Sequence, residues 1–172
     1  MFSPQYIVSI GEKPLDFKLE DQDGNKTRLP QKGTVALYFY SKDDTPGCTK
    51  QACSFRDNYT ELIKKDIRVI VISGDDKKSH KEFKEKHDLP FPLLCDTDKE
   101  VCEQYGVAEQ KQMFGNKYIG INRTTFIIQD GTLKEKITDI DVGNHAENIL
   151  EIVKNLNKIY KCKTTVSELY EG

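Results

Sequence analysis

Val35-Ala-Leu-Tyr-Phe-Tyr40 and Ile67-Arg-Val-Ile-Val-Ile72 are the two stretches that decide the fold. Both are short apolar runs, a pattern typical of strands that are covered on both faces. Residues 49–64 between them carry apolar side chains at spacings of three and four, which predicts a helix. A strand, a helix and a second strand in succession favour a right-handed parallel crossover.

Two hairpins flank this unit, and each is built around an Asp-Gly turn signal, because glycine tolerates positive φ. The first joins residues 16–20 to 27–29 through Asp23-Gly24, and the second joins 124–128 to 133–138 through Asp130-Gly131. The second hairpin adds antiparallel pairing to the parallel crossover. The sequence therefore predicts a mixed sheet with an N-terminal hairpin.

Three further helices are expected. Residues 77–88 form a charged helix that ends before Pro90, and we expect a solvated face that includes His80 and His87. A short helix follows at 99–105, and a final helix runs from an N-cap at Asn144 to about residue 160. Together these elements predict an α/β sandwich, a mixed sheet with flanking helices, that is compatible with the thioredoxin fold. The predicted division is one domain over residues 1–160 and a C-terminal tail over 161–172.

Composition narrows the class of protein. Lys and Arg total 26 against 28 Asp and Glu, and neither charge gathers into a block, so we expect no nucleic-acid partner. Apolar runs stay well short of the roughly 20 residues that a membrane span needs. Residues 1–11 lack the features of a signal peptide. We therefore expect a cytoplasmic protein without a membrane partner.

Five cysteines stand at 48, 53, 95, 102 and 162, and three histidines are scattered among them. In a reducing compartment an odd number of cysteines does not indicate a static disulfide framework. Structural zinc needs clustered ligands at short spacings, whereas these cysteines are 5, 42, 7 and 60 residues apart. We expect neither a metal nor a cofactor.

Cys48 lies at the predicted start of the first helix. Thr45 is a good N-cap residue, and Pro46 fits the first helical position, where its missing N–H costs nothing. Cys48 therefore falls in the first turn, where free backbone N–H groups and the positive end of the helix dipole face its sulfur. That environment stabilises a thiolate, the nucleophilic form of cysteine. The alternative is a small buried residue that only packs, and the Thr-Pro-Gly start favours the reactive thiol.

Four segments carry a resemblance to a known family. They are Thr45-Pro-Gly-Cys-Thr-Lys-Gln-Ala-Cys53, Asp21-Gln-Asp-Gly24, Asp96 to Val107 and Arg123-Thr-Thr-Phe-Ile-Ile128. Over about residues 9–156 the chain resembles the bacterioferritin-comigratory-protein or PrxQ group of peroxiredoxins.

The resemblance implies an activity and the residues that perform it. Peroxiredoxins of this group reduce hydrogen peroxide and organic hydroperoxides, with electrons from thioredoxin or a similar dithiol. The matching residues are Cys48 as the peroxidatic cysteine, Cys53 as the resolving cysteine, and Thr45 and Arg123 as activators. A monomer is expected. The alternative is a non-catalytic redox sensor or holdase that uses the same disulfide, whereas a general disulfide oxidoreductase would carry C-x-x-C.

Helix geometry restricts the pairing of the two cysteines. Five residues of helix place the Cα atoms of Cys48 and Cys53 roughly 8–9 Å apart. A disulfide tolerates at most about 7 Å. The pair can therefore bond only if the first turns of the helix unwind.

The chain departs from the family pattern near the cysteine. Ser41 stands where the family has a proline, seven residues before Cys48, which changes the shielding of the sulfur. Asp43 and Asp44 are expected to point into solvent, since carboxylates near a thiolate oppose its ionisation. Cys95 and Cys102 are expected in the core. Cys162, between two lysines, is expected to be exposed and is an alternative resolving thiol.

Overall fold

A computed structural model describes residues 8–170, with side chains described for all of these except 160 and 164–170. The elements in chain order are β1 (Lys18–Asp21), β2 (Lys26–Arg28), β3 (Thr34–Phe39), α1 (Pro46–Asp57), α2 (Tyr59–Lys64), β4 (Ile67–Ser73), α3 (Lys77–Lys86), β5 (Leu93–Cys95), α4 (Glu100–Gln104), β6 (Ala108–Met113), β7 (Asn116–Ile121), β8 (Thr124–Gln129), β9 (Thr132–Ile137) and α5 (His145–Tyr170).

The main sheet has the strand order β2-β1-β5-β4-β3-β8-β9. Strand β3 pairs with β4 in parallel and with β8 antiparallel, and β4 pairs with β5 in parallel. Hairpins β1–β2 and β8–β9 are both antiparallel. The predicted crossover, the mixed sheet and the two hairpins are therefore confirmed.

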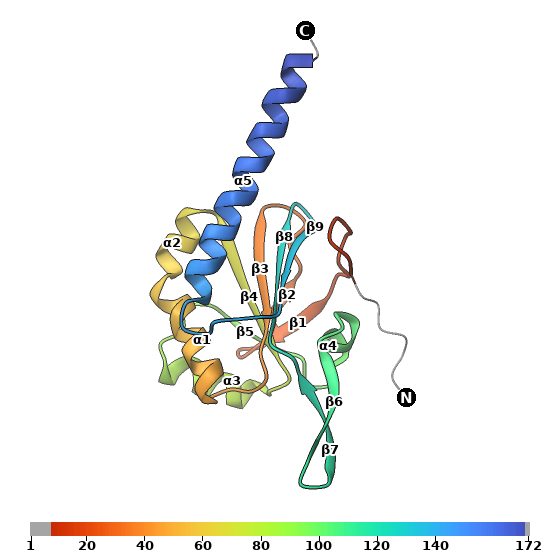
Figure 1. Cartoon of the computed structure of the whole chain (residues 1–172). Coiled ribbons are helices and arrows are strands. Elements are labelled where there is room, and N and C mark those ends of the chain that lie inside the picture. Colours follow the sequence, from red (N-terminus) through yellow and green to blue (C-terminus); the bar gives the residue numbers. More distant parts are fainter. Residues whose placement is uncertain (1–7, 171–172) are drawn as a thin grey trace.

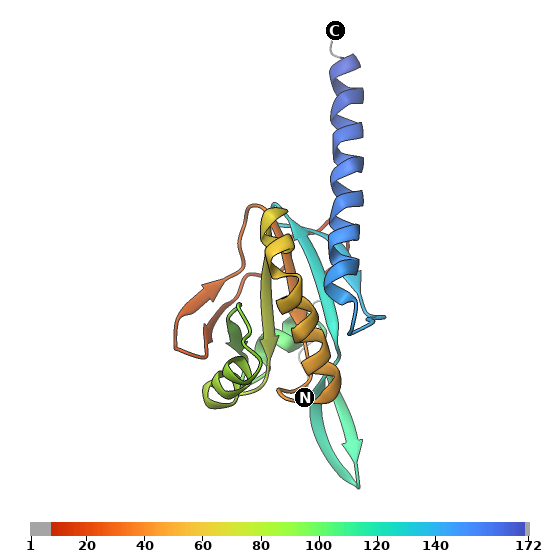
Figure 2. The ribbon, with the colours of Figure 1, turned by 90° about the vertical axis from the view of Figure 1, so that its left-hand side faces the viewer.

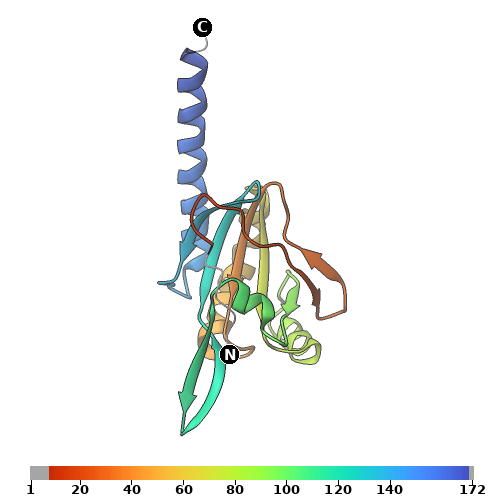
Figure 3. The same cartoon turned by 90° about the vertical axis from the view of Figure 1, so that its right-hand side faces the viewer.

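Helices cover both faces of this sheet. Figure 2 shows α1 and α2 in front of the sheet, and Figure 3 shows α4 in front of the opposite face, with the β1–β2 hairpin at one edge. A hydrophobic core lies on each face of the sheet. Strand β3 contributes side chains to both cores, because successive side chains of a strand point to opposite faces. Tyr38 stacks on Phe55 of α1 with ring centroids 4.7 Å apart, whereas Phe39 packs on Tyr105 and Phe126.

Two helices differ from their predicted form. The helix expected over 49–64 breaks at Asn58, whose side-chain amide donates to the Ser54 carbonyl at 2.9 Å, so α1 and α2 are separate. Helix α3 has a solvated face, but His80 is not part of it, because its side chain is fully buried. The prediction of a solvated His80 is wrong, and the reason lies at the site described below.

Helix α5 is longer than predicted. It continues to Tyr170 instead of ending near residue 160, and its last turns extend beyond the sheet (Figure 1). Within residues 8–170, no helix is long and apolar enough to cross a membrane. The division into a domain over 1–160 and a tail over 161–172 stays a prediction.

The hairpin β6–β7 was not predicted from the sequence. It forms a separate two-stranded sheet that projects from the end of the molecule opposite to α5 (Figure 1). Its strands are mostly exposed, so they lack the alternating apolar pattern that marks a half-buried strand. Its tip residue Phe114 is 96% exposed.

Candidate active site

Cys48 lies where strand β3 leads through a short loop into α1. Thr45 has the extended backbone of an N-cap, with φ −81° and ψ 151°, and Pro46 is the first helical residue. Cys48 is therefore the third residue of a 12-residue helix, as predicted, and its side chain is 2% exposed. The free N–H groups of the first turn and the helix dipole favour negative charge at this position.

Two polar side chains contact the sulfur, one from the loop before α1 and one from the residue before β8. Ser41 Oγ lies 3.3 Å from Cys48 Sγ, and Arg123 Nη2 donates to the same atom at 3.4 Å. Burial of the thiol raises its pKa, but hydrogen bonds from Ser41, Thr45 and the Lys42 backbone, together with the charge of Arg123, lower it by more. The net result is a Cys48 pKa below its ordinary value, which increases the thiolate fraction.

Arg123 is oriented by α1 itself. It precedes β8, and its Nη1 donates to Gln51 Oε1 at 2.6 Å while Nη2 reaches the sulfur. Gln51 is fully buried on α1, about one turn after Cys48. Gly47 makes the approach possible, because a Cβ at this position would lie 3.0 Å from Nη2.

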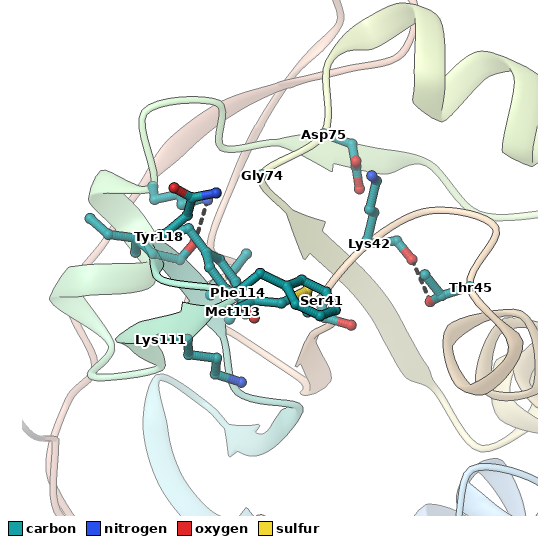
Figure 4. Close-up of a pocket in the computed structure, with 14 residues that line it drawn as sticks. Ser41, Lys42, Thr45, Gly74, Asp75, Lys111, Met113, Phe114 and Tyr118 are labelled. Atoms are coloured by element: carbon teal, nitrogen blue, oxygen red, sulfur yellow. Dashed lines mark hydrogen bonds between the residues drawn. The ribbon is translucent and has the colours of Figure 1, made fainter.

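A cavity of about 790 Å³ opens beside residues 40–45, the loop between β3 and α1, which we call the thiol loop. Figure 4 shows Lys42 and Thr45 on one side of it and Lys111 and Tyr118 of the β6–β7 hairpin on the other. Met113 and Phe114 add apolar surface to the hairpin side. The cavity therefore joins a polar edge, which includes the Ser41 side chain that contacts the sulfur, to a partly apolar wall.

Asp43 is buried, and the expectation that it points into solvent is wrong. Its carboxylate accepts hydrogen bonds from the Tyr40 hydroxyl, from Ser79 Oγ at 2.8 Å and from His80 Nδ1 at 2.7 Å. Burial alone would lower the pKa of His80, but the hydrogen bond and charge of Asp43, with a further contribution from Cys95, raise it to about 10. An imidazolium therefore neutralises the buried carboxylate within the thiol loop. Asp44, by contrast, lies at the surface and pairs with Lys86 at 2.7 Å.

This buried pair lies next to Asp75, and one ligand atom from each of the three residues falls within 4.8 Å of the others. All three are already engaged: Asp75 accepts from the Asp43 backbone N–H at 2.9 Å and from Ser73 Oγ at 2.7 Å. A protonated His80 has no lone pair for a metal ion. The cluster is therefore better explained as an internal network than as a metal centre.

The other four cysteines are free thiols in different environments. Cys53 lies half-buried on α1, Cys95 half-buried at the end of β5, and Cys162 is exposed on α5. Cys102 is fully buried, and burial raises the pKa of its thiol. The expected burial of Cys102 and exposure of Cys162 are confirmed, whereas Cys95 is only partly in the core; a resolving role for Cys162 stays a prediction.

Comparison with known proteins shows the family to which this chain and its cysteine site belong. The sequence profile of the AhpC/TSA family matches residues 10–136. The chain belongs to this family. Peroxiredoxin Bcp of Escherichia coli is 43% identical over 150 residues, which cover 86% of this chain and 96% of that protein.

Two solved structures have the same fold. The bacterioferritin comigratory protein of Xanthomonas campestris has a TM-score of 0.74 at 32% identity, covering 81% of this chain and 90% of that one. A mutant of PrxQ from Xylella fastidiosa has a TM-score of 0.80 at 29% identity, covering 90% and 99%. The chain is thus a peroxiredoxin of the Bcp/PrxQ group with a thioredoxin-like fold, and an enzyme of the thiol peroxidase class.

For this peroxiredoxin, sequence reasoning missed three features of the site. Ser41 was noted only as a departure from the family pattern, yet its hydroxyl lies on the sulfur. Gln51 belongs to the quoted motif, but nothing in the motif says that it orients Arg123. The pairing of Asp43 with His80 joins residues 37 apart in sequence, and no local pattern could have shown it.

Proposed function

We propose that this peroxidase acts through Cys48 as the peroxidatic cysteine and Cys53 as the resolving cysteine. The observation that carries the proposal is the Cys48 sulfur, buried at the head of α1 with Arg123 Nη2 at 3.4 Å and a lowered pKa. A thiolate held beside a fixed cation is suited to attack a peroxide. Thr45 and Arg123 act as activators.

The first step consumes the peroxide. The Cys48 thiolate attacks one peroxide oxygen, so that an S–O bond forms while the O–O bond breaks. The sulfur loses two electrons and becomes a sulfenic acid, and the leaving alkoxide or hydroxide takes up a proton from solvent. The Arg123 guanidinium stabilises the negative charge as it moves to the leaving oxygen. The Thr45 hydroxyl donates to the Lys42 carbonyl at 2.9 Å, which leaves its oxygen free to accept the peroxide O–H.

The second step forms the disulfide. The Cys53 thiolate attacks the sulfenic sulfur, an S–S bond forms, and the S–O bond breaks; the leaving hydroxide takes up a proton from solvent and departs as water. Both cysteines lie within α1, so their Cα atoms are roughly 8–9 Å apart in the intact helix, beyond the reach of a disulfide. The start of α1 must therefore unwind. An external dithiol, thioredoxin or a similar protein, then reduces the disulfide by exchange.

The substrates are hydrogen peroxide and organic hydroperoxides. The structure of the Xanthomonas campestris relative is described in terms of its alkyl peroxide reduction activity. The cavity beside the thiol loop has an apolar wall formed by Met113, Phe114 and Tyr118, which suits the alkyl group of an organic hydroperoxide and supports this substrate class for the present chain. We infer that the protein works as a monomer, which analytical ultracentrifugation of the reduced and oxidised forms would test.

Cys53→Ser tests the resolving role. We expect the variant to consume about one equivalent of hydroperoxide and then to stall, with thioredoxin-supported turnover at least about tenfold lower, because the sulfenic acid has no partner. Dimedone labelling of Cys48, followed by mass spectrometry, checks that the sulfenic acid accumulates. Cys162→Ser is the matched control and should keep full turnover. If Cys162→Ser stalls instead, the tail supplies the resolving thiol and the assignment of Cys53 is wrong.

Hydrogen exchange tests the unwinding of α1. After one equivalent of peroxide, amides of residues 46–56 should exchange faster and should recover on addition of dithiol. The physical reason is that a disulfide between Cys48 and Cys53 cannot form in an intact helix, whose first turn includes the bond from Thr49 N–H to Thr45 O at 2.8 Å. Cys53→Ser should show no acceleration. Unchanged protection alongside a Cys48–Cys53 disulfide in mass spectrometry would refute the geometric argument.

A further inference from the structure

The hydroxyl of Ser41 lies in the active site in a position that the peroxidase mechanism above does not use. Its Oγ is 3.3 Å from Cys48 Sγ, and the side chain also lines the cavity beside the thiol loop (Figure 4). We propose that Ser41 is a further catalytic residue, whose hydroxyl donates a hydrogen bond to the Cys48 thiolate. This inference rests on the proposed role of Cys48 as the attacking thiol.

The direction of the hydrogen bond follows from counting protons. A thiolate has no proton, so in the reactive state only the hydroxyl can donate. The neighbouring Thr45 hydroxyl has a single proton and directs it to the Lys42 carbonyl at 2.9 Å. Thr45 must therefore release the Lys42 carbonyl before it can donate to the sulfur, whereas the Ser41 hydroxyl already lies on the sulfur at 3.3 Å. The hydrogen bonds of both hydroxyls, that of Ser41 before that of Thr45, are among the causes that lower the pKa of Cys48.

The surrounding residues fix Ser41 from both sides. Tyr40 before it is buried, and its backbone N–H donates to the Ile72 carbonyl at 3.1 Å. Asp43 after it is buried and bonded to His80 of α3 at 2.7 Å. A donor placed between two anchored residues needs little reorganisation to meet the charge of the thiolate. The buried Asp43–His80 pair thus has a positioning role for the loop that carries Ser41.

A serine at this position has chemistry that a proline lacks. Proline has neither a side-chain donor nor a backbone N–H, so it can shield the sulfur but not donate to it. A hydroxyl stabilises the thiolate and raises its fraction at neutral pH. The same stabilisation makes the thiolate a somewhat weaker nucleophile once ionisation is complete, because nucleophilicity falls as thiol pKa falls. The larger thiolate fraction speeds the reaction at low pH, whereas the weaker nucleophilicity slows it at high pH, so a pH profile separates the two effects.

The charged and titratable groups around the Cys48–Arg123 pair do not obscure this separation. They include Tyr38 on β3, Asp43 in the thiol loop, Cys53 on α1, Asp141 before α5, His145 at the start of α5, and the charged residues of the adjoining cavity, Lys42, Asp75, Lys99 and Lys111. Burial raises the pKa of Tyr38 well above its ordinary value, and burial lowers that of His145 to about 4. Asp43 is held as an ion pair with His80. A Cys53→Ser background removes the second thiol of α1 from the measurement.

The experiment compares Ser41→Ala with Ser41→Thr, both in the Cys53→Ser background. Single-turnover sulfenic acid formation and iodoacetamide alkylation of Cys48 are followed by mass spectrometry from pH 5 to 9. We expect Ser41→Ala to move both profiles to higher pH and to be about three- to tenfold slower at the acid end, yet no slower where Cys48 is fully ionised. Ser41→Thr keeps a hydroxyl and should follow the parent protein.

Two results would overturn the inference. Profiles of Ser41→Ala that coincide with the parent at every pH would show that the hydroxyl does nothing for the thiolate. A Ser41→Ala rate reduced by the same factor at every pH would show a packing defect instead. Neither result touches the proposed function, which fails only if Cys48 itself proves dispensable for peroxide reduction.

Discussion

Cys48→Ser should reduce hydroperoxide turnover to the rate measured without protein. The sulfur is the atom that accepts the peroxide oxygen, and a serine hydroxyl in the same place is neither appreciably ionised nor able to form a sulfenic acid. Arg123 and Ser41 would then contact a neutral oxygen with no reaction to support. Peroxide consumption with thioredoxin, thioredoxin reductase and NADPH measures the effect directly.

Two other cysteine variants serve as controls for this measurement. Cys162→Ser changes an exposed side chain on α5, and Cys102→Ser changes a buried thiol whose pKa is raised by burial. Both should keep most of the activity. Substantial turnover by Cys48→Ser would remove the basis for the site, whereas a disulfide that forms without any turnover in the parent protein would favour a redox sensor.

Local signals explain why the centre of the fold could be predicted. Val35–Tyr40 and Ile67–Ile72 are apolar enough to be buried strands, and the residues between them carry the helical spacing that a parallel crossover needs. The helix start at Thr45 and Pro46 depends on backbone chemistry within one turn. The position of Cys48 at an electropositive helix end therefore followed from its immediate neighbours.

The rest of the site depends on contacts between distant segments. The Asp43 side chain looks like an ordinary loop carboxylate until His80 of α3 is placed beside it at 2.7 Å. Gln51 lies four residues before Phe55 on the buried face of α1, and the role of its polar side chain becomes clear only when Arg123 arrives from the start of β8. Such pairings are decided by packing of the whole domain, which a single sequence does not reveal.

The same reasoning explains why the cavity was missed. One of its walls belongs to the β6–β7 hairpin, whose residues are largely polar and solvent-exposed. Lys99 Nζ donates to the Ile119 carbonyl at 2.5 Å and ties this hairpin to the start of α4. The contact joins residues 20 apart through a side chain, so neither hydrophobic periodicity nor turn chemistry predicts it.

Arg123→Ala should slow sulfenic acid formation by a factor between about tens and hundreds, the loss expected when one positioned donor is removed from a developing charge. The guanidinium contacts the sulfur at 3.4 Å, and its charge also helps to lower the pKa of Cys48. Removing it raises that pKa, so the defect should be larger at low pH, where less thiolate remains. Stopped-flow single-turnover kinetics at several pH values measures both parts.

Two further variants separate charge from geometry in this experiment. Arg123→Lys keeps a positive charge but loses the fork that reaches both Cys48 Sγ and Gln51 Oε1, so an intermediate rate is expected. Gly47→Ala leaves Arg123 in the chain but places a Cβ 3.0 Å from Nη2, which should displace the guanidinium and give a smaller defect of the same kind. Circular dichroism checks that each variant is folded. A first-step rate in Arg123→Ala equal to that of the parent would mean that Arg123 only fills the space beneath α1 and that the thiolate reacts without its help.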